Sequence, residues 1–342
     1  MCIRDSFQAF HHDLYRSVGQ GRWWVMEQQP GPVNWAPWNP APLPGMVRLW
    51  AIEAAAHGAE VISYFRWRQA PFAQEQLHAG LLYPDDTPAP GLSEAASAGD
   101  VLKALPKQLE PASTVALIFD YTSDWMWKVL PQGQDFDYFR LVFSAYRALR
   151  RAGYSVDILS PESHDFTGYT TILAPGLGVI PQDLADALAE CDARAIVGPR
   201  SNLSTEHHAT RLPMGPALPG LDVTVTHVES LPPEVSIPVQ PTGHIRHWRE
   251  HIRGSAKIRT QASDGSPVLI GNDTLAYLTA WPDDALWDHL LGTTDPLPDG
   301  LRIRDTHSHR FLINYSAHAQ TWNGQTVPAC DALILEHEHC PK

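Results

Sequence analysis

The stretch WWVMEQQPGPVNW, residues 23–35, combines a short apolar run, one carboxylate, a Pro/Gly turn and a further tryptophan. The run at residues 23–26 is too short for a helix and is bounded by residues that break regular structure, so it predicts a buried strand. Glu27 then lies at the C-terminal end of that strand, where α/β barrels carry their catalytic groups. Aromatic rings around a carboxylate suit a sugar. The alternative is a structural glutamate that accepts hydrogen bonds from backbone N–H groups.

A second stretch, VISYFRWRQ at residues 61–69, alternates between polar and apolar positions and is rich in residues that favour strands. Between the two stretches, residues 46–57 have helical spacing of their apolar side chains, and Gly58 supplies a stop. The order is therefore strand, helix, strand, which is the repeating unit of a parallel barrel.

The pattern WWVMEQQPGPVNW followed by YFRWRQAPFAQEQLHAGLLYPDDTP closely resembles the family 42 glycoside hydrolases, which are barrel-fold β-galactosidases. The resemblance extends from about residue 8 to the C-terminus. It implies that Glu27 is the nucleophile that forms a galactosyl-enzyme intermediate. It also implies a galactose subsite, in which Glu75 and His78 bond the sugar hydroxyls. The residues that line this subsite would be Trp35, Phe65, Glu75 and His78.

Each of these assignments has a simpler alternative. For Phe65 and Trp35 the alternative is ordinary packing in a hydrophobic core. Glu75 and His78 are three residues apart, which would place them on one face of a helix. Their alternative is a solvated pair on the protein surface.

The chemistry of a retaining glycosidase exposes a gap in the sequence. Such enzymes need two carboxyl groups about 5–5.5 Å apart, one as nucleophile and one as acid/base. The resemblance implies that the acid/base is the Glu of an Asn-Glu pair, and the 342 residues contain no such pair. A (β/α)₈ barrel takes roughly 250 residues, so the first 105 have room for two or three of its eight units. We therefore expect residues 1–106 to be the C-terminal remnant of a TIM barrel, in a fragment that is inactive alone.

The composition restricts the partners and the location. A net charge of −13 argues against nucleic acid, which demands clustered Lys and Arg. No apolar run approaches 18 residues, which argues against a membrane span. The four cysteines are far apart in the sequence and predict reduced thiols in a cytoplasmic protein.

Beyond a linker marked by Pro106 and Pro111, a second domain is expected over residues 111–236. Strands and helices alternate there with short connections, which predicts an open, doubly wound α/β sheet. The resemblance implies a glutamine-amidotransferase-like domain that serves for subunit contact, commonly in homotrimers. The expected elements are a strand at 115–120, a helix at 136–152, strands at 155–159 and 170–174, a helix at 182–190 and a strand at 193–197.

An amidotransferase would need a thiol nucleophile at a sharp turn between a strand and a helix. The corresponding turn, residues 198–201, reads GPRS and holds no cysteine. Cys191 precedes the strand and is better explained as a small buried side chain. The sequence therefore predicts no amidotransferase chemistry in this domain.

A third domain is expected over residues 240–342, where short β-rich runs recur between turn signals such as Asp264-Gly265 and Asn323-Gly324. This spacing predicts a small antiparallel sandwich or barrel. At its end, His337 and His339 would share one face of an extended chain and Cys340 the other. We interpret this tail as an exposed strand end and expect no metal and no organic cofactor.

The parent protein is therefore expected to be a retaining β-galactosidase that hydrolyses terminal non-reducing β-D-galactosides. Two alternatives remain open from the sequence. The first is a non-catalytic oligomerisation or glycan-interaction module, which would keep any sugar binding after deletion of residues 1–105. The second is a related retaining glycosidase such as an α-L-arabinopyranosidase, whose substrate differs from galactose by one exocyclic group.

Overall fold

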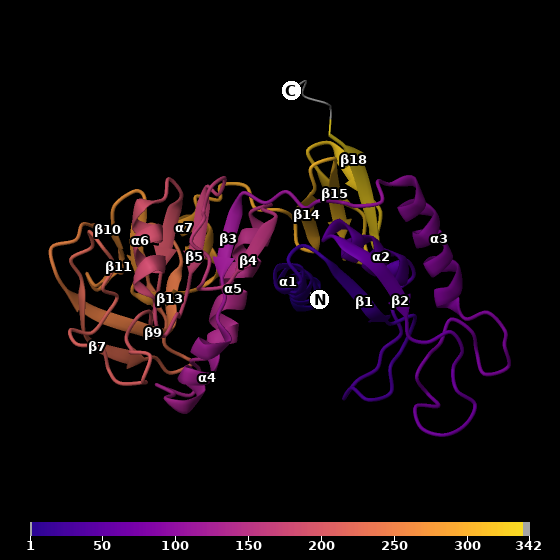
Figure 1. Ribbon diagram of the computed structural model, residues 1–342, viewed down its shortest axis with the longest axis horizontal. Helices are drawn as coiled ribbons and strands as arrows, with labels where there is room; N and C mark the ends of the chain where they lie inside the picture. Colours follow the sequence, from indigo (N-terminus) through magenta and orange to yellow (C-terminus); the bar gives the residue numbers. More distant parts are fainter. Residues whose placement is uncertain (1, 338–342) are drawn as a thin grey trace. The chain divides into compact units, whose positions relative to one another are not determined.

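The computed structural model describes residues 2–337 and divides into two compact units, each considered by itself below (Figure 1). Unit 1 combines Met1–Ser113 with Leu297–Lys342, and unit 2 is Thr114–Pro296. This division differs from the expected boundaries at 111–236 and 240–342. The reason is that the strands between residues 258 and 278 continue the sheet of unit 2, whereas the strands after residue 300 belong to unit 1.

Unit 1 begins with helices that alternate with two parallel strands. The strands pair with each other in register from Trp23 opposite Ala59 to Gln28 opposite Tyr64. The predicted strand–helix–strand order at residues 23–69 is thereby confirmed. The elements are α1 (Cys2–Val18), β1 (Trp23–Gln28), α2 (Met46–Ala56), β2 (Ala59–Tyr64) and α3 (Pro90–Ala104).

Strand β1 is not buried as predicted. Trp23 and Gln28 are buried, but Trp24, Met26 and Glu27 are exposed. Within residues 2–337 only β2 pairs with β1, so one edge of the strand has no neighbour. An interior strand of a parallel sheet is covered on both faces and paired on both edges, and β1 lacks part of that cover.

Strand β2 ends at Tyr64, five residues before the predicted end. The backbone beyond it pairs with a later segment, because the N–H groups of Leu81 and Leu82 donate to the carbonyls of Arg66 and Trp67, both at 2.8 Å. The segment that follows β2 therefore folds into a loop rather than extending the strand.

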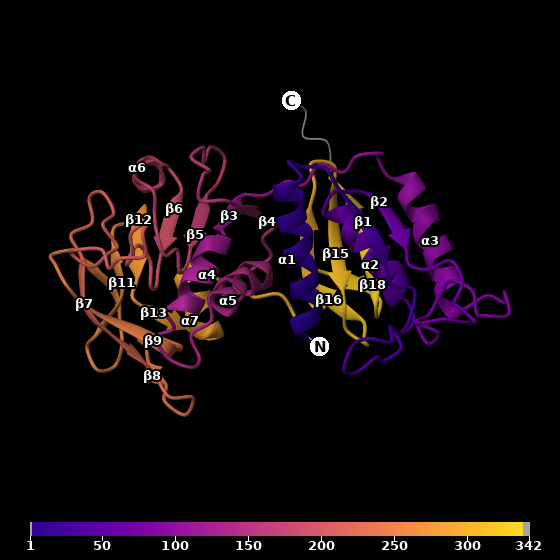
Figure 2. The ribbon, with the colours of Figure 1, turned by 60° about the horizontal axis from the view of Figure 1, so that its bottom comes forward.

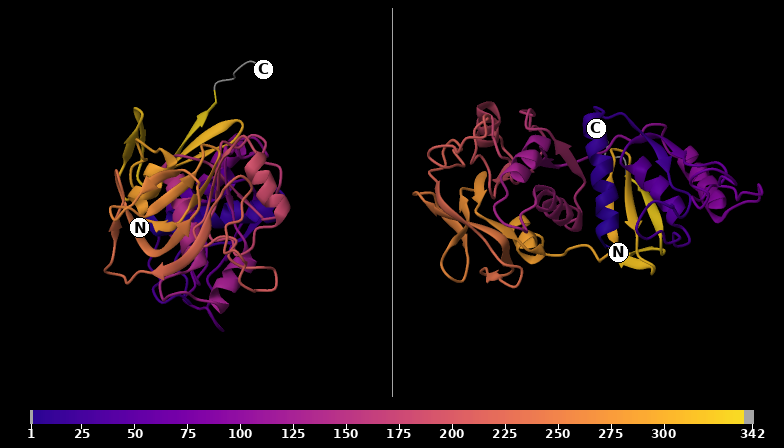
Figure 3. Two further views of the ribbon diagram at one scale, coloured as in Figure 1. Left: turned by 90° about the vertical axis from the view of Figure 1, so that its left-hand side faces the viewer. Right: turned by 90° about the horizontal axis from the view of Figure 1, so that it is seen from below.

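The C-terminal strands complete the core of unit 1. Strands β14 (Leu301–Asp305), β15 (His309–Asn314) and β18 (Asp331–Glu336) form an antiparallel sheet, drawn in yellow in Figures 1 and 3, and α2 is labelled beside it in Figure 1. The apolar face of α2 packs on it. A hairpin of β16 (Gln320–Trp322) and β17 (Gln325–Val327) turns at the predicted Asn-Gly pair. The residues of the shared core include Leu49, Ile52, Phe311, Ile313 and Tyr315.

A buried charged cluster connects the two sequence segments that make up unit 1. The carboxylate of Asp13, on α1, lies 2.8 Å from Nδ1 of His57 and 3.2 Å from Nη1 of Arg304. All three side chains are fully buried. The Arg304 guanidinium and the His57 ring outweigh the desolvation of Asp13 and hold its pKa well below the usual range.

Unit 2 is built on a seven-stranded sheet in the order β10-β11-β12-β6-β5-β3-β4. The five strands from β12 to β4 run parallel, and β10 and β11 are antiparallel additions. The chain enters at β3, places β4 on one side and then builds β5, β6 and β12 on the other. The strands are β3 (Val115–Ile118), β4 (Val156–Leu159), β5 (Thr171–Ala174), β6 (Arg194–Val197), β10 (Ile258–Gln261), β11 (Pro267–Gly271) and β12 (Leu275–Leu278).

Four helices and a second sheet surround this framework (Figure 2). The predicted helices at 136–152 and 182–190 are confirmed as α5 (Tyr138–Arg151) and α6 (Gln182–Glu190). Helix α5 packs against both α4 and α7. The remaining elements are α4 (Tyr121–Val129), α7 (Asp284–Leu291), β7 (Thr224–Ser230), β8 (Ile237–Pro238), β9 (His244–Arg253) and β13 (Ala280–Pro282).

Candidate active site

Glu27 occupies the penultimate position of β1, and its side chain is exposed. The strand ends there because Pro30 and Pro32 lack the N–H groups that a sheet ladder uses. One residue beyond Glu27, the carbonyl of Gln28 accepts a hydrogen bond of 3.1 Å from the N–H of Phe65. The C-terminal ends of β1 and β2 are thus joined, and the segment that follows β2 starts beside Glu27.

Phe65 and His78 are in direct contact. Their ring centroids are 5.1 Å apart with the planes at 69°, which is an edge-to-face arrangement. His78 is 2% exposed, so the alternative of a solvated surface pair does not hold for it. Phe65 is half-buried.

The predicted helix through Glu75 and His78 is wrong. These residues form a single turn, in which the N–H of His78 donates to the carbonyl of Glu75 at 3.0 Å. Ala73 and Glu75 both have positive φ, at 64° and 59°, which costs a non-glycine residue about 1–2 kcal/mol. Such strain in two residues of one loop is typical of a functional site.

Arg66 connects the remaining side chains. Its Nη2 donates to the carboxylate of Glu75, and its guanidinium lies over the Phe65 ring at 4.5 Å from the centroid. Glu75 is half-buried through this ion pair. The peptide bond between Phe65 and Arg66 is cis.

Burial lowers the pKa of His78 below its ordinary value, and the Arg66 guanidinium acts in the same direction. The carboxylates of Glu75 and Glu27 act in the opposite direction but do not outweigh burial. The lowered pKa favours the neutral form of the His78 ring at pH 7. The charges of Glu27 and Glu75 both reach it, so these carboxylates belong to one electrostatic site.

Trp35 lies apart from this group. It is 69% exposed, so it does not pack in a core, and within residues 2–337 it makes no hydrogen bond or ring contact with the other four candidate residues. The structure thus connects Phe65, Glu75 and His78 through ring contacts and Arg66. It places Glu27 next to Gln28, whose carbonyl accepts from Phe65, and leaves Trp35 on a solvent-facing loop.

Two residues that contact the candidate side chains were not singled out from the sequence. Arg66 adjoins a candidate residue, and Gln29 follows Glu27 by two positions, so both stood inside the quoted motifs. Their side-chain chemistry could have identified them, because a guanidinium pairs with a carboxylate and an amide oxygen can accept a hydrogen bond from a histidine. Gln29 Oε1 lies 2.6 Å from Nε2 of His78.

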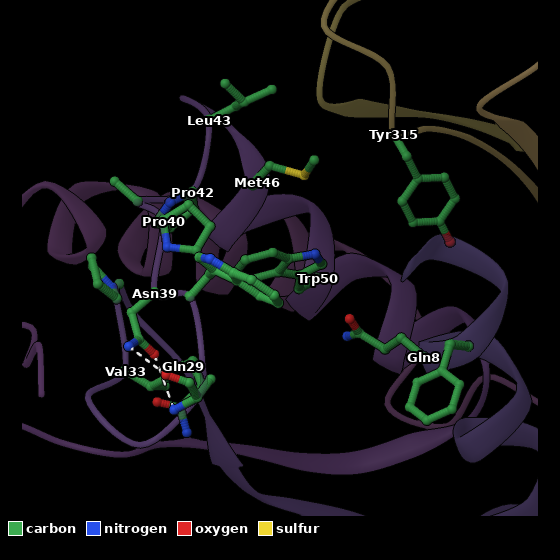
Figure 4. A pocket seen from close by; sticks show the side chains of 16 residues that line it. Gln8, Gln29, Val33, Asn39, Pro40, Pro42, Leu43, Met46, Trp50 and Tyr315 are labelled. Carbon is green, nitrogen blue, oxygen red and sulfur yellow. Dashed lines mark hydrogen bonds between the residues drawn. The ribbon is translucent and has the colours of Figure 1, made fainter. Parts of the chain in front are cut away.

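Gln29 also borders a pocket of about 590 Å³ in unit 1 (Figure 4). Trp50 and Met46 of α2, Gln8 of α1 and Tyr315 contribute to its walls. None of the five candidate residues lines this pocket, and Gln29 connects it to the candidate site through its contact with His78. The other labelled lining residues are Val33, Asn39, Pro40, Pro42 and Leu43.

No group of three or more His, Cys, Asp or Glu side chains suited to a metal ion occurs in the described part of the chain. The tail residues His339 and Cys340 lie outside the described residues. No helix between residues 2 and 337 combines the length and apolar character that a membrane crossing requires.

In unit 2, residues 198–201, compared above with an amidotransferase turn, directly follow β6. Arg200 occupies this turn with φ of 55°. Arg200 is 2% exposed, and its guanidinium lies over the rings of Trp127, Phe136 and Trp248, at 3.9, 4.5 and 4.9 Å from their centroids. A guanidinium enclosed by three aromatic rings therefore occupies this turn.

Comparison with known protein families finds a match in each of the two units. Residues 4–105 match a family model described as "Beta-galactosidase", and residues 113–295 match one described as "Beta-galactosidase trimerisation domain". The chain belongs to the family 42 glycoside hydrolases. The resemblance seen in the motifs is thereby confirmed.

Among relatives of this family, the chain is 45% identical to a β-galactosidase of Thermus thermophilus over 324 residues, which is 91% of the chain and 50% of the relative. It is 35% identical to Bga of Halorubrum lacusprofundi, covering 90% of the chain and 49% of the relative. The chain spans about half the length of the curated relatives it matches.

A solved structure of a family member gives the same result. The β-galactosidase of the psychrophilic Marinomonas ef1 superposes with a TM-score of 0.89 at 36% identity, over 97% of the chain and 55% of that structure. The α/β fold is therefore that of a family whose members have TIM-barrel catalytic domains.

Proposed function

We propose that this chain supplies the nucleophile side of a retaining β-galactosidase site for terminal non-reducing β-D-galactosides. In this proposal β1 and β2 are the last two strands of a (β/α)₈ barrel, and Glu27 stands at the end of the first of them. The observation that supports the proposal is the cluster of Glu27, Phe65, Glu75 and His78, set in loops that follow two parallel strands.

In the proposed mechanism, the Glu27 carboxylate attacks the anomeric carbon and the bond to the leaving group breaks. A galactosyl ester on Glu27 forms, and water then hydrolyses it with net retention. Glu75, held by Arg66, accepts hydrogen bonds from sugar hydroxyls, and the Phe65 ring provides an apolar face. Trp35 would reach the sugar only from its exposed loop.

The first step also requires a general acid for the leaving-group oxygen, at about 5–5.5 Å from the nucleophile. No Asn-Glu pair of the family pattern occurs in the sequence. In our proposal the chain therefore depends on another polypeptide segment for its acid/base and does not turn over substrate alone.

The test joins this chain to the N-terminal half of its 45% identical Thermus relative. We expect the purified chain alone to leave nitrophenyl β-galactoside intact and the joined protein to hydrolyse it. Replacement Glu27→Ala in the joined protein should reduce kcat by about 10⁴-fold or more. Added azide should restore cleavage and give the α-galactosyl azide, because the anion fills the space of the missing carboxylate.

Glu60→Ala is the matched control, since Glu60 is a carboxylate on the neighbouring strand that pairs with Arg22. It should retain activity. Full activity in Glu27→Ala would overturn the assignment of the nucleophile, and rapid cleavage by the chain alone would overturn the need for a second segment.

We also propose that unit 2 assembles the protein as a homotrimer. The match of residues 113–295 to the trimerisation domain of the family supports homo-oligomerisation. A cytoplasmic location is part of the same proposal, supported by Cys191 and Cys330, which are both free thiols.

A further inference from the structure

His78 is held on one side by a neutral acceptor. Gln29 Oε1 lies 2.6 Å from its Nε2, and an amide oxygen can only accept a hydrogen bond. The hydrogen of the neutral ring therefore belongs on Nε2. The other ring nitrogen, Nδ1, is buried and has no hydrogen-bond partner among the described residues.

Backbone contacts keep Gln29 and His78 together. The N–H of Ala79 donates to the carbonyl of Pro32 at 2.9 Å, which ties the turn that carries His78 to the loop that carries Gln29. The Phe65 ring meets the imidazole edge-to-face. These contacts oppose a 180° rotation of the His78 ring, which would exchange the positions of its two nitrogens.

We propose that Gln29 is a positioning residue that holds His78 in the Nε2–H tautomer, so that Nδ1 is the acceptor for a hydroxyl proton of the sugar. This inference rests on the proposed function and adds the direction of one hydrogen bond: the sugar hydroxyl donates to His78. A buried acceptor without a hydrogen bond is destabilising, and a donating hydroxyl removes that cost.

The choice of an amide rather than a carboxylate follows from the charges around the ring. Glu75, Glu27 and Arg66 are the charged groups that act on His78, and the two carboxylates favour its protonated form. A third carboxylate at position 29 would add to them. The ring would then carry hydrogens on both nitrogens and could accept nothing.

The experiment is nitrogen NMR of the ¹⁵N-histidine-labelled full chain, with His78 assigned by the loss of its signals in His78→Gln. In the wild type at pH 7 we expect a pyridine-like Nδ1 and a pyrrole-like Nε2. Gln29→Leu should give a mixture of tautomers. Gln29→Glu should raise the pKa of His78 and make both nitrogens pyrrole-like at pH 7.

Gln8→Leu is the matched control, because Gln8 borders the same pocket but its amide faces His12, at 3.4 Å. The signals of His78 should be unchanged in it. Added D-galactose should move the Nδ1 signal in the wild type and not in Gln29→Glu.

An Nδ1–H tautomer in the wild type, which requires no variant to fold, would overturn the proposal. So would a wild-type tautomer in Gln29→Leu, or an Nδ1 signal that D-galactose leaves in place while other signals of the protein show that the sugar binds. The tautomer is read without turnover, so its failure is distinct from a failure of the joined protein to hydrolyse galactosides.

Discussion

At the scale of single residues, burial decides which protonation states the chain carries. Glu250 is a clear case outside the candidate site. Its carboxyl accepts from the backbone N–H of Arg200 at 2.7 Å, from Trp248 Nε1 at 3.2 Å and from the Tyr277 hydroxyl at 2.7 Å. Even so, desolvation raises its pKa to about 7.

The raised pKa of Glu250 predicts a loss of stability as the pH rises. The unfolded chain releases this proton near pH 4.5, whereas the folded chain keeps it until about pH 7. The stabilisation is fully present below pH 4.5 and is lost as the pH rises through 7, with a total of about 3 kcal/mol. Glu250→Gln removes the titration and keeps an acceptor oxygen, so it should raise the unfolding free energy at pH 8 relative to wild type.

Urea unfolding at pH 5 and pH 8 measures this difference. Glu234→Gln, at an exposed position, serves as the control and should unfold like the wild type at both pH values. An equal pH dependence in Glu250→Gln and wild type would contradict the prediction.

At the scale of elements, helix α2 is the centre of unit 1. It connects the two parallel strands and packs its other apolar positions on the C-terminal sheet. Leu49 is fully buried in that core. The stability of unit 1 therefore depends on side chains of α2 as much as on strand pairing.

Leu49→Ala should destabilise the chain by about 2–5 kcal/mol, because it removes buried methyl groups and leaves a cavity. Leu212→Ala makes the same chemical change at a position that is 83% exposed and should have little effect. Thermal unfolding followed by circular dichroism compares the two. Equal melting temperatures for both variants would show that α2 does not rest on the sheet as described.

The sequence predicted elements well where the pattern was local. The strands at 23–28 and 115–118 and the helices at 46–56 and 138–151 followed from apolar spacing and from glycine stops such as Gly58. Helix α3 was not predicted, although Pro90 at its start is a known signal.

The sequence placed the candidate residues in two motifs but did not show their geometry, and their roles remain predictions. The quoted motifs contained Glu27, Phe65, Glu75 and His78, of which Phe65 contacts His78 and both Phe65 and Glu75 contact Arg66. The helix expected at 75–78 failed because Ala73 and Glu75 adopt left-handed backbone angles, which propensity alone does not reveal. The sequence also does not show which elements pack against an apolar helix face, because periodicity identifies the face but not the element that covers it.

At the scale of the whole molecule, the two units separate the proposed tasks. Unit 1 carries the candidate site, and unit 2 carries the trimerisation match. Unit 2 is one continuous insertion between the two parts of unit 1 in the sequence. Assembly can therefore be measured without any assay of activity.

The chain should sediment as a trimer, with a mass about three times the 37.9 kDa of one chain. Apolar faces buried between copies would supply the free energy, so the trimer should persist in salt. Sedimentation equilibrium over a range of concentrations provides the measurement. A single species of one-chain mass at every concentration would contradict the prediction.

The contact between α2 and the last strands also sets the order in which a ribosome can complete this protein. Glu53 on α2 bonds the Tyr315 hydroxyl, 262 residues later in the chain. At ~5–20 residues per second the nascent chain waits roughly 10–50 s between the two. During this interval unit 2 can fold, but the apolar side of α2 remains uncovered. Unit 2 can thus fold before unit 1 is complete, and chaperones have a defined surface to shield until β14, β15 and β18 have been made.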